Sequence, residues 1–290
     1  MLSKPVELPC AVQISNLSKT FGKRKALDNI SFKVNQGEMI ALIGPSGSGK
    51  STLLRHISAL IKPDKVNSRI RVFNRVIQEN GKISPDIRQV RAEMGFIFQQ
   101  FNLVGRMTLL KNVCVGLLAQ IPLWRSILQY FTVNEKREAM KALKKVGLEE
   151  HAMQRACTLS GGQQQRASIA RAMQQKAKII LADEPIASLD PESARKVMEL
   201  LLSLNIEYGV SVLISLHQIQ FALQYCNRSI ALNKGKIVYD GLSKNLTPDL
   251  LKEIYGMSIS EIITDGTDSI DNNDCSNTII SSLAEAKCNV

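Results

Sequence analysis

The composition of this 290-residue chain indicates a globular protein, because 44% of the residues are hydrophobic and a chain of this length can bury a sizeable core. Lys and Arg number 37 against 26 Asp and Glu, a net charge of +11, which fits a nucleotide, a nucleic acid or an anionic membrane surface as partner. Nucleic acid is disfavoured, because the cations are scattered and no basic helix or aromatic-interleaved strand stands out.

The cysteines and the apolar segments exclude further classes. The six cysteines form no C-x-x-C pair and have no histidine at ligand spacing, which argues against zinc and disulfides and favours a reducing compartment. Residues 1–10 lack the apolar core of a signal peptide. Polar residues and a proline interrupt the longest apolar run, residues 113–131, so we expect no membrane-spanning segment.

The first elements in chain order predict an antiparallel β-layer followed by an α/β unit. Apolar residues alternate at residues 12–14 and 30–34, and a turn signal follows at residues 35–37. The continuous apolar run at residues 39–43 then leads through a glycine-rich loop into a helical pattern at residues 51–57. This order of strand, loop and helix is typical of the first unit of a buried parallel sheet.

The remaining elements extend the parallel sheet and insert helices into it. Buried-strand runs recur at residues 179–182 and 210–215, with a helical pattern at residues 191–204 between them. The pattern between about residues 101 and 164 is helical without strand runs. We therefore expect one domain over residues 1–256 with a helical subdomain at about 101–164, and a loose polar tail at residues 257–290 without an assigned role.

The glycine-rich loop predicts a site for ATP and Mg²⁺. The segment GPSGSGKST matches G-x-x-x-x-G-K-[ST] between a strand and a helix, where glycines let backbone N–H groups turn toward phosphate oxygens. The ammonium of Lys50 should reach the β- and γ-phosphates, and the hydroxyl of Ser51 should bind Mg²⁺. The predicted loop residues are Gly44, Pro45, Ser46, Gly47, Ser48, Gly49, Lys50, Ser51 and Thr52.

Two adjacent carboxylates follow the strand at residues 179–182. Because side chains alternate along a strand, Asp183 and Glu184 should point to different sides of its end. Asp183 can hold Mg²⁺ through water, and Glu184 can polarise an attacking water as general base. An ordinary exposed turn is the alternative, which the nucleotide loop in the same chain disfavours.

A second glycine-containing helix start lies in LSGGQQQR, residues 159–166. Ser160, Gly161, Gly162 and Gln163 open the helix there, so its free amides can bind an anion. One ATP has a single γ-phosphate, which the first loop already holds. The second site therefore has a use if it binds the ATP of another copy, which predicts a homodimer with two ATPs bound head to tail.

Together these segments resemble the nucleotide-binding subunits of ATP-binding cassette (ABC) transporters over residues 12–255. GPSGSGKST resembles the Walker A motif, IILADE the Walker B motif, LSGGQ the signature and Ser188-Leu189-Asp190 the D-loop. The resemblance implies that Asp190 lies at the nucleotide, Gln99 binds the metal and takes part in catalysis with Glu184 and His217, His217 senses the γ-phosphate, and Phe21 stacks on adenine. A core role for Phe21, a cap role for His217, and Gln100 in place of Gln99 are the alternatives.

Three runs resemble the ATP-binding subunits of phosphonate importers, namely residues 91–113, 122–131 and 180–195. The resemblance implies a P-loop NTPase fold with a RecA-like parallel-sheet core, an N-terminal antiparallel β-subdomain and an inserted helical subdomain. It also implies ATP and Mg²⁺ as cofactors, a second copy and transmembrane permease subunits as direct partners, a solute-binding protein as indirect partner, and a peripheral place on the cytoplasmic face of the cell membrane.

The cargo implied by these runs is a phosphonate, phosphite or a phosphate ester. Another small-solute importer and a soluble ABC ATPase are the alternatives in function. A soluble repair ATPase would need a long coiled-coil insertion, and a translation-factor ATPase would need two tandem cassettes; neither pattern is visible in the sequence. A P-loop small-molecule kinase would have no use for LSGGQ.

Overall fold

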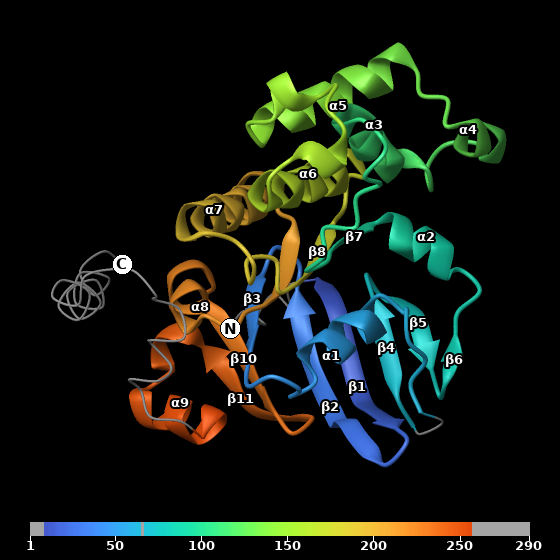
Figure 1. Cartoon of the computed structure of the whole chain (residues 1–290). Coiled ribbons are helices and arrows are strands. Elements are labelled where there is room, and N and C mark those ends of the chain that lie inside the picture. Colours follow the sequence, from blue (N-terminus) through green and yellow to red (C-terminus); the bar gives the residue numbers. More distant parts are fainter. Residues whose placement is uncertain (1–8, 65–66, 257–290) are drawn as a thin grey trace, which may run out of the picture.

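Two β-sheets form the base of the molecule, and a group of helices lies above them (Figure 1). The computed structural model describes residues 9–64 and 67–256, so the tail expected at residues 257–290 lies outside the described residues. The first sheet has the strand order β2-β1-β4-β5-β6 and the second β11-β10-β3-β9-β8-β7. The chain is thus an α/β protein with one antiparallel and one largely parallel sheet.

The first sheet is the predicted antiparallel β-layer. β1 pairs with β2 in a register that joins Val12 to Val34 and Ile14 to Phe32, and all four side chains are buried. The alternation of apolar and polar residues follows from this, because only one face of the layer packs on the core. The strands of this sheet are β1 (Cys10–Phe21), β2 (Arg24–Asn35), β4 (Arg69–Val72), β5 (Arg75–Glu79) and β6 (Lys82–Ile83).

The second sheet carries the predicted parallel core. β3, β9 and β8 lie side by side and parallel, and every residue in these three strands is buried. Burial on both faces explains why their sequences read as continuous apolar runs. The strands of this sheet are β3 (Met39–Ile43), β7 (Met94–Ile97), β8 (Ile179–Asp183), β9 (Ser211–Ser215), β10 (Arg228–Asn233) and β11 (Lys236–Leu242).

The two faces of β3 belong to two separate hydrophobic cores. Ile40 and Leu42 pack into the core that β1, β2 and α1 close, whereas Ala41 and Ile43 pack into the core beneath the other helices. This split follows from the alternation of side chains along a strand. The helices next to the sheets are α1 (Lys50–Ile57), α2 (Ile87–Ala92), α7 (Pro191–Tyr208), α8 (Ile219–Tyr225) and α9 (Pro248–Tyr255).

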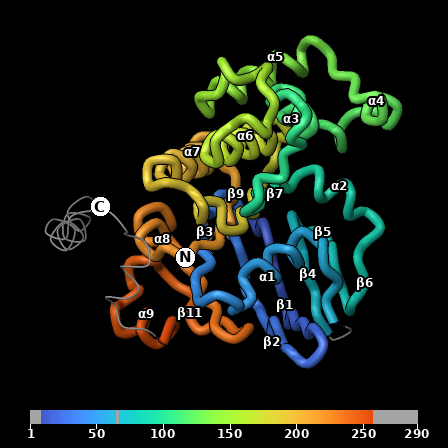
Figure 2. The backbone as a smooth tube through the Cα atoms, viewed as in Figure 1, coloured from blue at the N-terminus to red at the C-terminus, as the bar shows by residue number. Residues whose placement is uncertain are grey.

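A helical part is inserted between β7 and β8 and forms the upper layer in Figures 1 and 2. Its helices are α3 (Leu109–Cys114), α4 (Leu123–Leu128), α5 (Val133–Lys145) and α6 (Gly161–Gln174). These helices span residues 109–174 and overlap the helical pattern predicted at about residues 101–164; α6, which the signature residues begin, continues to Gln174. Within residues 9–64 and 67–256, no helix combines the length and the apolar character needed to cross a membrane.

Candidate functional site

The predicted site lies at the carboxyl ends of three neighbouring parallel strands. The glycine-rich loop follows β3, Glu184 follows β8 and His217 comes two residues after β9. Because β3, β9 and β8 are adjacent and parallel, their carboxyl ends meet at one edge of the sheet. Ligands of open α/β sheets bind at this edge.

The backbone of the loop is one that only glycine can adopt at its first and sixth positions. Gly44 has a φ of 134°, and a Cβ there would lie 2.0 Å from the carbonyl oxygen of Leu232. Gly49 has a φ of 113°, and its Cβ would lie 2.7 Å from the carbonyl oxygen of Ala26. The resulting loop leads into the N-terminus of α1, whose first N–H groups point out of the helix. This arrangement fits phosphate groups.

Lys50 is held at the mouth of the loop. Its Nζ donates hydrogen bonds to the carbonyl oxygens of Gly44 (2.7 Å) and Pro45 (3.2 Å), and the residue is buried. Burial lowers the pKa of the Lys50 ammonium, whereas the charges of Glu184 and Asp183 oppose that shift. Two carboxylates on one side and the loop on the other therefore place this cation where phosphate charge would bind.

A cavity of about 300 Å³ opens in front of the loop. Phe21 is 48% exposed at its edge, which argues against a core role for this ring, and Lys19 lies 5.3 Å from the ring centre. Arg24, which the sequence analysis missed, donates from Nη2 to the carbonyl oxygen of Gly47 at 2.8 Å. The lining residues are Phe21, Arg24, Ala26, Gly47, Gly49, Lys50, Ser51, Thr52 and Glu184.

Four polar residues at the ends of β8 and β9 form one hydrogen-bonded chain. Ser215 donates to Oδ1 of Asp183 (3.1 Å) and accepts from the backbone N–H of Glu184 (2.8 Å). Oε1 of Glu184 lies 2.6 Å from Nε2 of His217. The hydrogen bond from His217, with a smaller contribution from Lys50, holds the pKa of the Glu184 carboxyl below its usual range. Glu184 is therefore an ionised, oriented carboxylate beside the loop.

The signature residues lie at the start of α6, away from this cavity. Ser160 and Gln163 form a capping box, in which the Ser160 Oγ accepts from the Gln163 N–H (3.3 Å) and the Gln163 Oε1 accepts from the Ser160 N–H (2.9 Å). A Cβ on Gly162 would lie 2.6 Å from Oγ of Ser193, and Asp190 accepts the N–H of Ser193 at 2.9 Å. The starts of α6 and α7 thus pack together.

Several predicted residues do not line the cavity of their own chain. Ser160, Gly161, Gly162, Gln163 and Asp190 are absent from its lining, as are Gln99, Asp183 and His217. Of the predicted loop residues, Gly47, Gly49, Lys50, Ser51 and Thr52 line it, whereas Gly44, Pro45, Ser46 and Ser48 do not. Gln99 lies exposed in the turn after β7, and within the described part of the chain its side chain makes no hydrogen bond. Asp183 and His217 are tied to the cavity through Ser215 and Glu184, whereas the α6 start and Gln99 have no such link.

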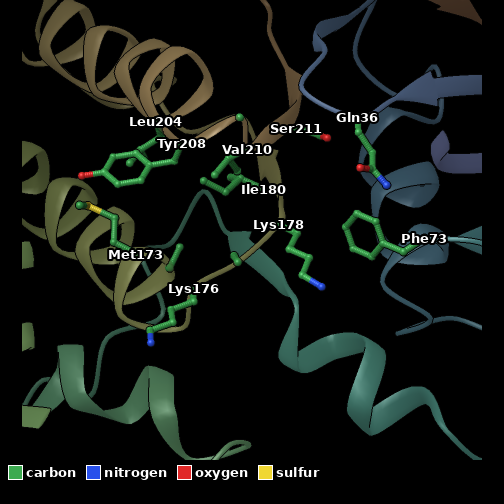
Figure 3. A pocket seen from close by; sticks show the side chains of 13 residues that line it. Gln36, Phe73, Met173, Lys176, Lys178, Ile180, Leu204, Tyr208, Val210 and Ser211 are labelled. Carbon is green, nitrogen blue, oxygen red and sulfur yellow. The ribbon is translucent and has the colours of Figure 1, made fainter. Parts of the chain in front are cut away.

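A larger cavity of about 400 Å³ lies at the opposite, amino ends of β8 and β9 (Figure 3). Its labelled walls include Met173, Ile180, Leu204, Tyr208 and Val210, and none of the predicted site residues lines it. Lys176 and Lys178 also border this cavity, but most of its lining is apolar and it contains neither the glycine-rich loop nor a carboxylate, so it does not fit a triphosphate with Mg²⁺. The chemistry of the lining therefore assigns the nucleotide to the smaller cavity.

Tyr255 contacts the loop from α9, and the sequence contains no signal for this contact. Its hydroxyl oxygen accepts the backbone N–H of Gly44 at 2.9 Å. Burial raises the pKa of Tyr255 to about 12, so the hydroxyl stays neutral. Lys50 binds the carbonyl oxygen of Gly44, so this one residue is held through both its N–H and its C=O groups.

We expect Tyr255→Phe to weaken ATP binding by about threefold to tenfold, because a buried N–H without an acceptor is destabilising and the loop must shift to satisfy it. Isothermal titration calorimetry with ATP would measure the change. Tyr239→Phe is the matched control, because the Tyr239 hydroxyl binds the carbonyl oxygen of Leu242 within β11. Equal ATP affinities in the native chain and in Tyr255→Phe would contradict a role of this tyrosine at the loop.

The sequence and the fold are similar to those of known proteins. The family described as ABC transporter matches residues 27–187. A protein of Paraburkholderia xenovorans (strain LB400) named phosphonates import ATP-binding protein PhnC is 53% identical over 269 residues, which cover 92% of this chain and 89% of the relative. A protein of the same name from Maricaulis maris (strain MCS10) is 54% identical over 246 residues, with 85% and 93% covered.

Solved structures with this fold include dimers of one cassette. The dimeric structure of MJ0796, a bacterial ABC transporter cassette, aligns with a TM-score of 0.70 and 34% identity over 80% of this chain and 98% of that one. A dimeric post-hydrolysis state of the ATP-binding cassette MJ0796 bound to ADP and Pi aligns with a TM-score of 0.68 and 34% identity over the same shares. With the nucleotide loop, the Glu184–His217 pair and the signature helix, these matches show that the chain belongs to the ABC transporter family.

Proposed function

We propose that this chain is the ATP-hydrolysing subunit of an ABC importer that takes up phosphonates, or related phosphorus oxyanions such as phosphite and phosphate esters, through a membrane permease. The main observation in support of ATP hydrolysis is that Lys50 and the ionised Glu184 line the same cavity. The cargo in this proposal is inferred from the names of relatives that are 51–54% identical to this chain. The ATP-binding domain in this proposal is residues 1–256, and the proposal assigns no role to residues 257–290.

ATP binds in the smaller cavity in this proposal. The triphosphate lies on the N–H groups of residues 44–52, with Lys50 against its β- and γ-phosphates and Phe21 stacked on the adenine. The Ser51 hydroxyl, the Asp183 carboxylate and the Gln99 amide are the oxygen donors that would hold Mg²⁺, which prefers such ligands. Bound Mg²⁺ would neutralise charge on the β- and γ-phosphates.

Glu184 accepts a proton from the attacking water. Its lowered pKa keeps the carboxylate ionised at neutral pH, and its place in the lining of the cavity supports contact with water beside the γ-phosphate. His217 orients this carboxylate through the 2.6 Å contact, and through Glu184 it would respond to the γ-phosphate.

Two copies of the chain enclose two ATPs in this proposal. The α6 start of each copy, Ser160 to Gln163, covers the γ-phosphate bound by its partner, with Asp190 beside it. The absence of these residues from the cavity of their own chain and the dimeric cassettes of MJ0796 support this arrangement. ATP binding closes the dimer and hydrolysis reopens it.

The permease senses this motion at residues 99–104, the segment that joins β7 to the helical part. The subunit is then a peripheral protein on the cytoplasmic face of the cell membrane, and a solute-binding protein on the other side delivers the cargo. The proposal includes no nucleic acid as partner.

Uptake of a labelled phosphonate tests the cargo and the function together. Cells that lack the gene would receive either the native chain or Glu184→Gln, with phosphite and phosphate as competitors. We expect uptake with the native chain alone, and the competitors would rank the cargoes. Equal uptake with both chains would contradict the role of ATP hydrolysis. No uptake with either chain would show that the importer takes up a solute other than a phosphonate.

A further inference from the structure

An apolar surface projects from the helical part at α4, at the outer edge of the molecule in Figure 1. α4 buries none of its six residues. Whereas Phe131 in the segment after α4 is buried, six large apolar side chains of α4, that segment and the first residue of α5 are between 57% and 77% exposed: Leu123, Trp124, Ile127, Leu128, Tyr130 and Val133. These six residues are called the α4 surface below. A contiguous patch of exposed apolar side chains is typical of a surface that binds a protein, a membrane or a ligand.

Polar contacts on the inner side of α4 hold the α4 surface in its conformation. Arg125 donates to the carbonyl oxygen of Tyr130 at 3.1 Å and pairs with Glu135, and its side chain is only 14% exposed. Ser126 donates to the carbonyl oxygen of Leu118 at 2.9 Å. The rings of Trp124 and Tyr130 are stacked, with 6.4 Å between the ring centroids and 18° between the ring planes. Within α4, Arg125 and Ser126 therefore face inward and the four apolar side chains face outward, the reverse of an ordinary solvated helix.

Cations of α5 border the α4 surface. Lys136, Arg137 and Lys141 line a shallow hollow together with Val133 and Met140. Lys141 pairs with Glu138, whereas Lys136 and Arg137 have no ion pair among the residues that the structure describes. The other acid at this edge, Glu135, is occupied by Arg125. The border of the apolar surface is thus positively charged.

We propose that the α4 surface docks on the surface of an anionic lipid bilayer. Leu and Ile side chains suit the boundary between headgroups and acyl chains, and the amphipathic rings of Trp and Tyr suit the headgroup level. Lys136 and Arg137 then face lipid phosphates, to which juxtamembrane cations are attracted. Aromatic residues, aliphatic residues and cations are together the composition of an interfacial segment.

A short surface of this kind binds lipid weakly by itself, since stable attachment to a membrane takes more than one signal. The inference therefore rests on the proposed function for its setting, in which a permease holds the subunit beside the bilayer. When the permease holds the subunit beside the bilayer, the effective concentration of lipid at the α4 surface is high. A weak affinity for lipid is then sufficient to orient the helical part. The contact itself is a property of the chain and can be measured without the permease.

Co-sedimentation of the purified full chain with lipid vesicles tests the proposal. We expect binding to vesicles rich in phosphatidylglycerol, weaker binding to pure phosphatidylcholine vesicles, and a loss of the difference at high salt. The double variant Trp124→Ser/Ile127→Ser should lower the partition coefficient by about tenfold or more, because two large apolar side chains no longer enter the interface. Lys136→Glu/Arg137→Glu should remove the preference for anionic lipid.

Ile206→Ser is the matched control, because Ile206 of α7 is 72% exposed and lies outside the α4 surface. Its partition coefficient should equal that of the native chain. Failure of the native chain to bind vesicles would overturn the proposal, as would equal binding by the Trp124→Ser/Ile127→Ser variant. Loss of binding to detergent-solubilised permease in that variant, with vesicle binding unchanged, would assign the surface to a protein partner and overturn the proposal too.

ATP hydrolysis by the same preparations separates this inference from the proposed function. The α4 variants should hydrolyse ATP like the native chain, because no residue of the α4 surface lines the nucleotide cavity. A native chain that binds vesicles without hydrolysing ATP would contradict the proposed function and leave the lipid contact in place. A chain that hydrolyses ATP without binding vesicles would do the opposite.

Discussion

Glu184→Gln is expected to slow ATP hydrolysis by about 10²- to 10⁴-fold, the contribution typical of a general base, while ATP binding is retained. Gln has the shape of Glu and can keep the contact with His217, but it cannot accept a proton at neutral pH. Release of phosphate measures hydrolysis, and calorimetry with ATP measures binding. In the native chain the lowered pKa of Glu184 keeps the base ionised, so the charge lost in the variant is one that is present at neutral pH.

Glu192→Gln is the matched control for this prediction. Glu192 lies in the first turn of α7, exposed, and pairs with Lys196. It does not line the nucleotide cavity, so its removal should leave hydrolysis unchanged. Native rates in Glu184→Gln would show that another group activates the water and would reassign the role of the Glu184–His217 pair.

Mixing Lys50→Ala chains with Gly161→Asp chains is expected to restore hydrolysis that neither variant shows alone. Lys50→Ala removes the cation on the phosphates and should weaken ATP binding by about 10- to 100-fold, as the loss of charged hydrogen bonds does. Gly161→Asp places a negative charge where the α6 start would meet the γ-phosphate. The substitution suits the helix itself, because acids are favourable in a first turn and a Cβ there meets only ordinary contacts at 3.4 Å and 3.5 Å.

The mixed dimer contains one intact site if the α6 start acts on the ATP of the partner. The loop of the Gly161→Asp chain then meets the native signature of the Lys50→Ala chain, so an equal mixture should reach about a quarter of the native rate for randomly paired, independent sites. Phosphate release as a function of the mixing ratio measures it.

A mixture of Lys50→Ala with Glu184→Gln is the control for the dimer prediction. Both changes fall on the loop side of the site, because Lys50 and Glu184 line the same cavity of one chain. No pairing of these two variants produces an intact site, so their mixture should stay inactive. Failure of the Lys50→Ala and Gly161→Asp mixture to recover, or equal recovery in the control, would argue against two shared sites.

The elements readable from the sequence are those whose conformation depends on neighbours in the chain. The parallel strands β3, β8 and β9 appear as continuous apolar runs because both of their faces are buried. The glycine loop and the start of α6 could be placed because turns and caps are formed by residues within three or four positions. The fold class and the family followed from these segments and their order.

Other elements gave no clear signal because partners distant in the chain stabilise them. β4 is short and alternates arginine with apolar residues, β5 is short and contains three polar residues among five, and β11 lies at the edge of its sheet with only half-buried or exposed residues. The sequence analysis predicted none of these three strands. β4 pairs with β1, β5 with β4 and β11 with β10, and this pairing supplies the order that local propensity does not.

The sequence by itself determined the identity of the loop, the two carboxylates and the signature helix, because each of these is a local backbone conformation with its own residue types. Only the tertiary structure decided how they are joined. Ser215 links Asp183 to Glu184 across adjacent strands, and Tyr255 reaches Gly44 from 211 residues further along the chain. Such contacts depend on the packing of whole strands and helices, which bring together side chains whose separation in the sequence carries no trace of the contact.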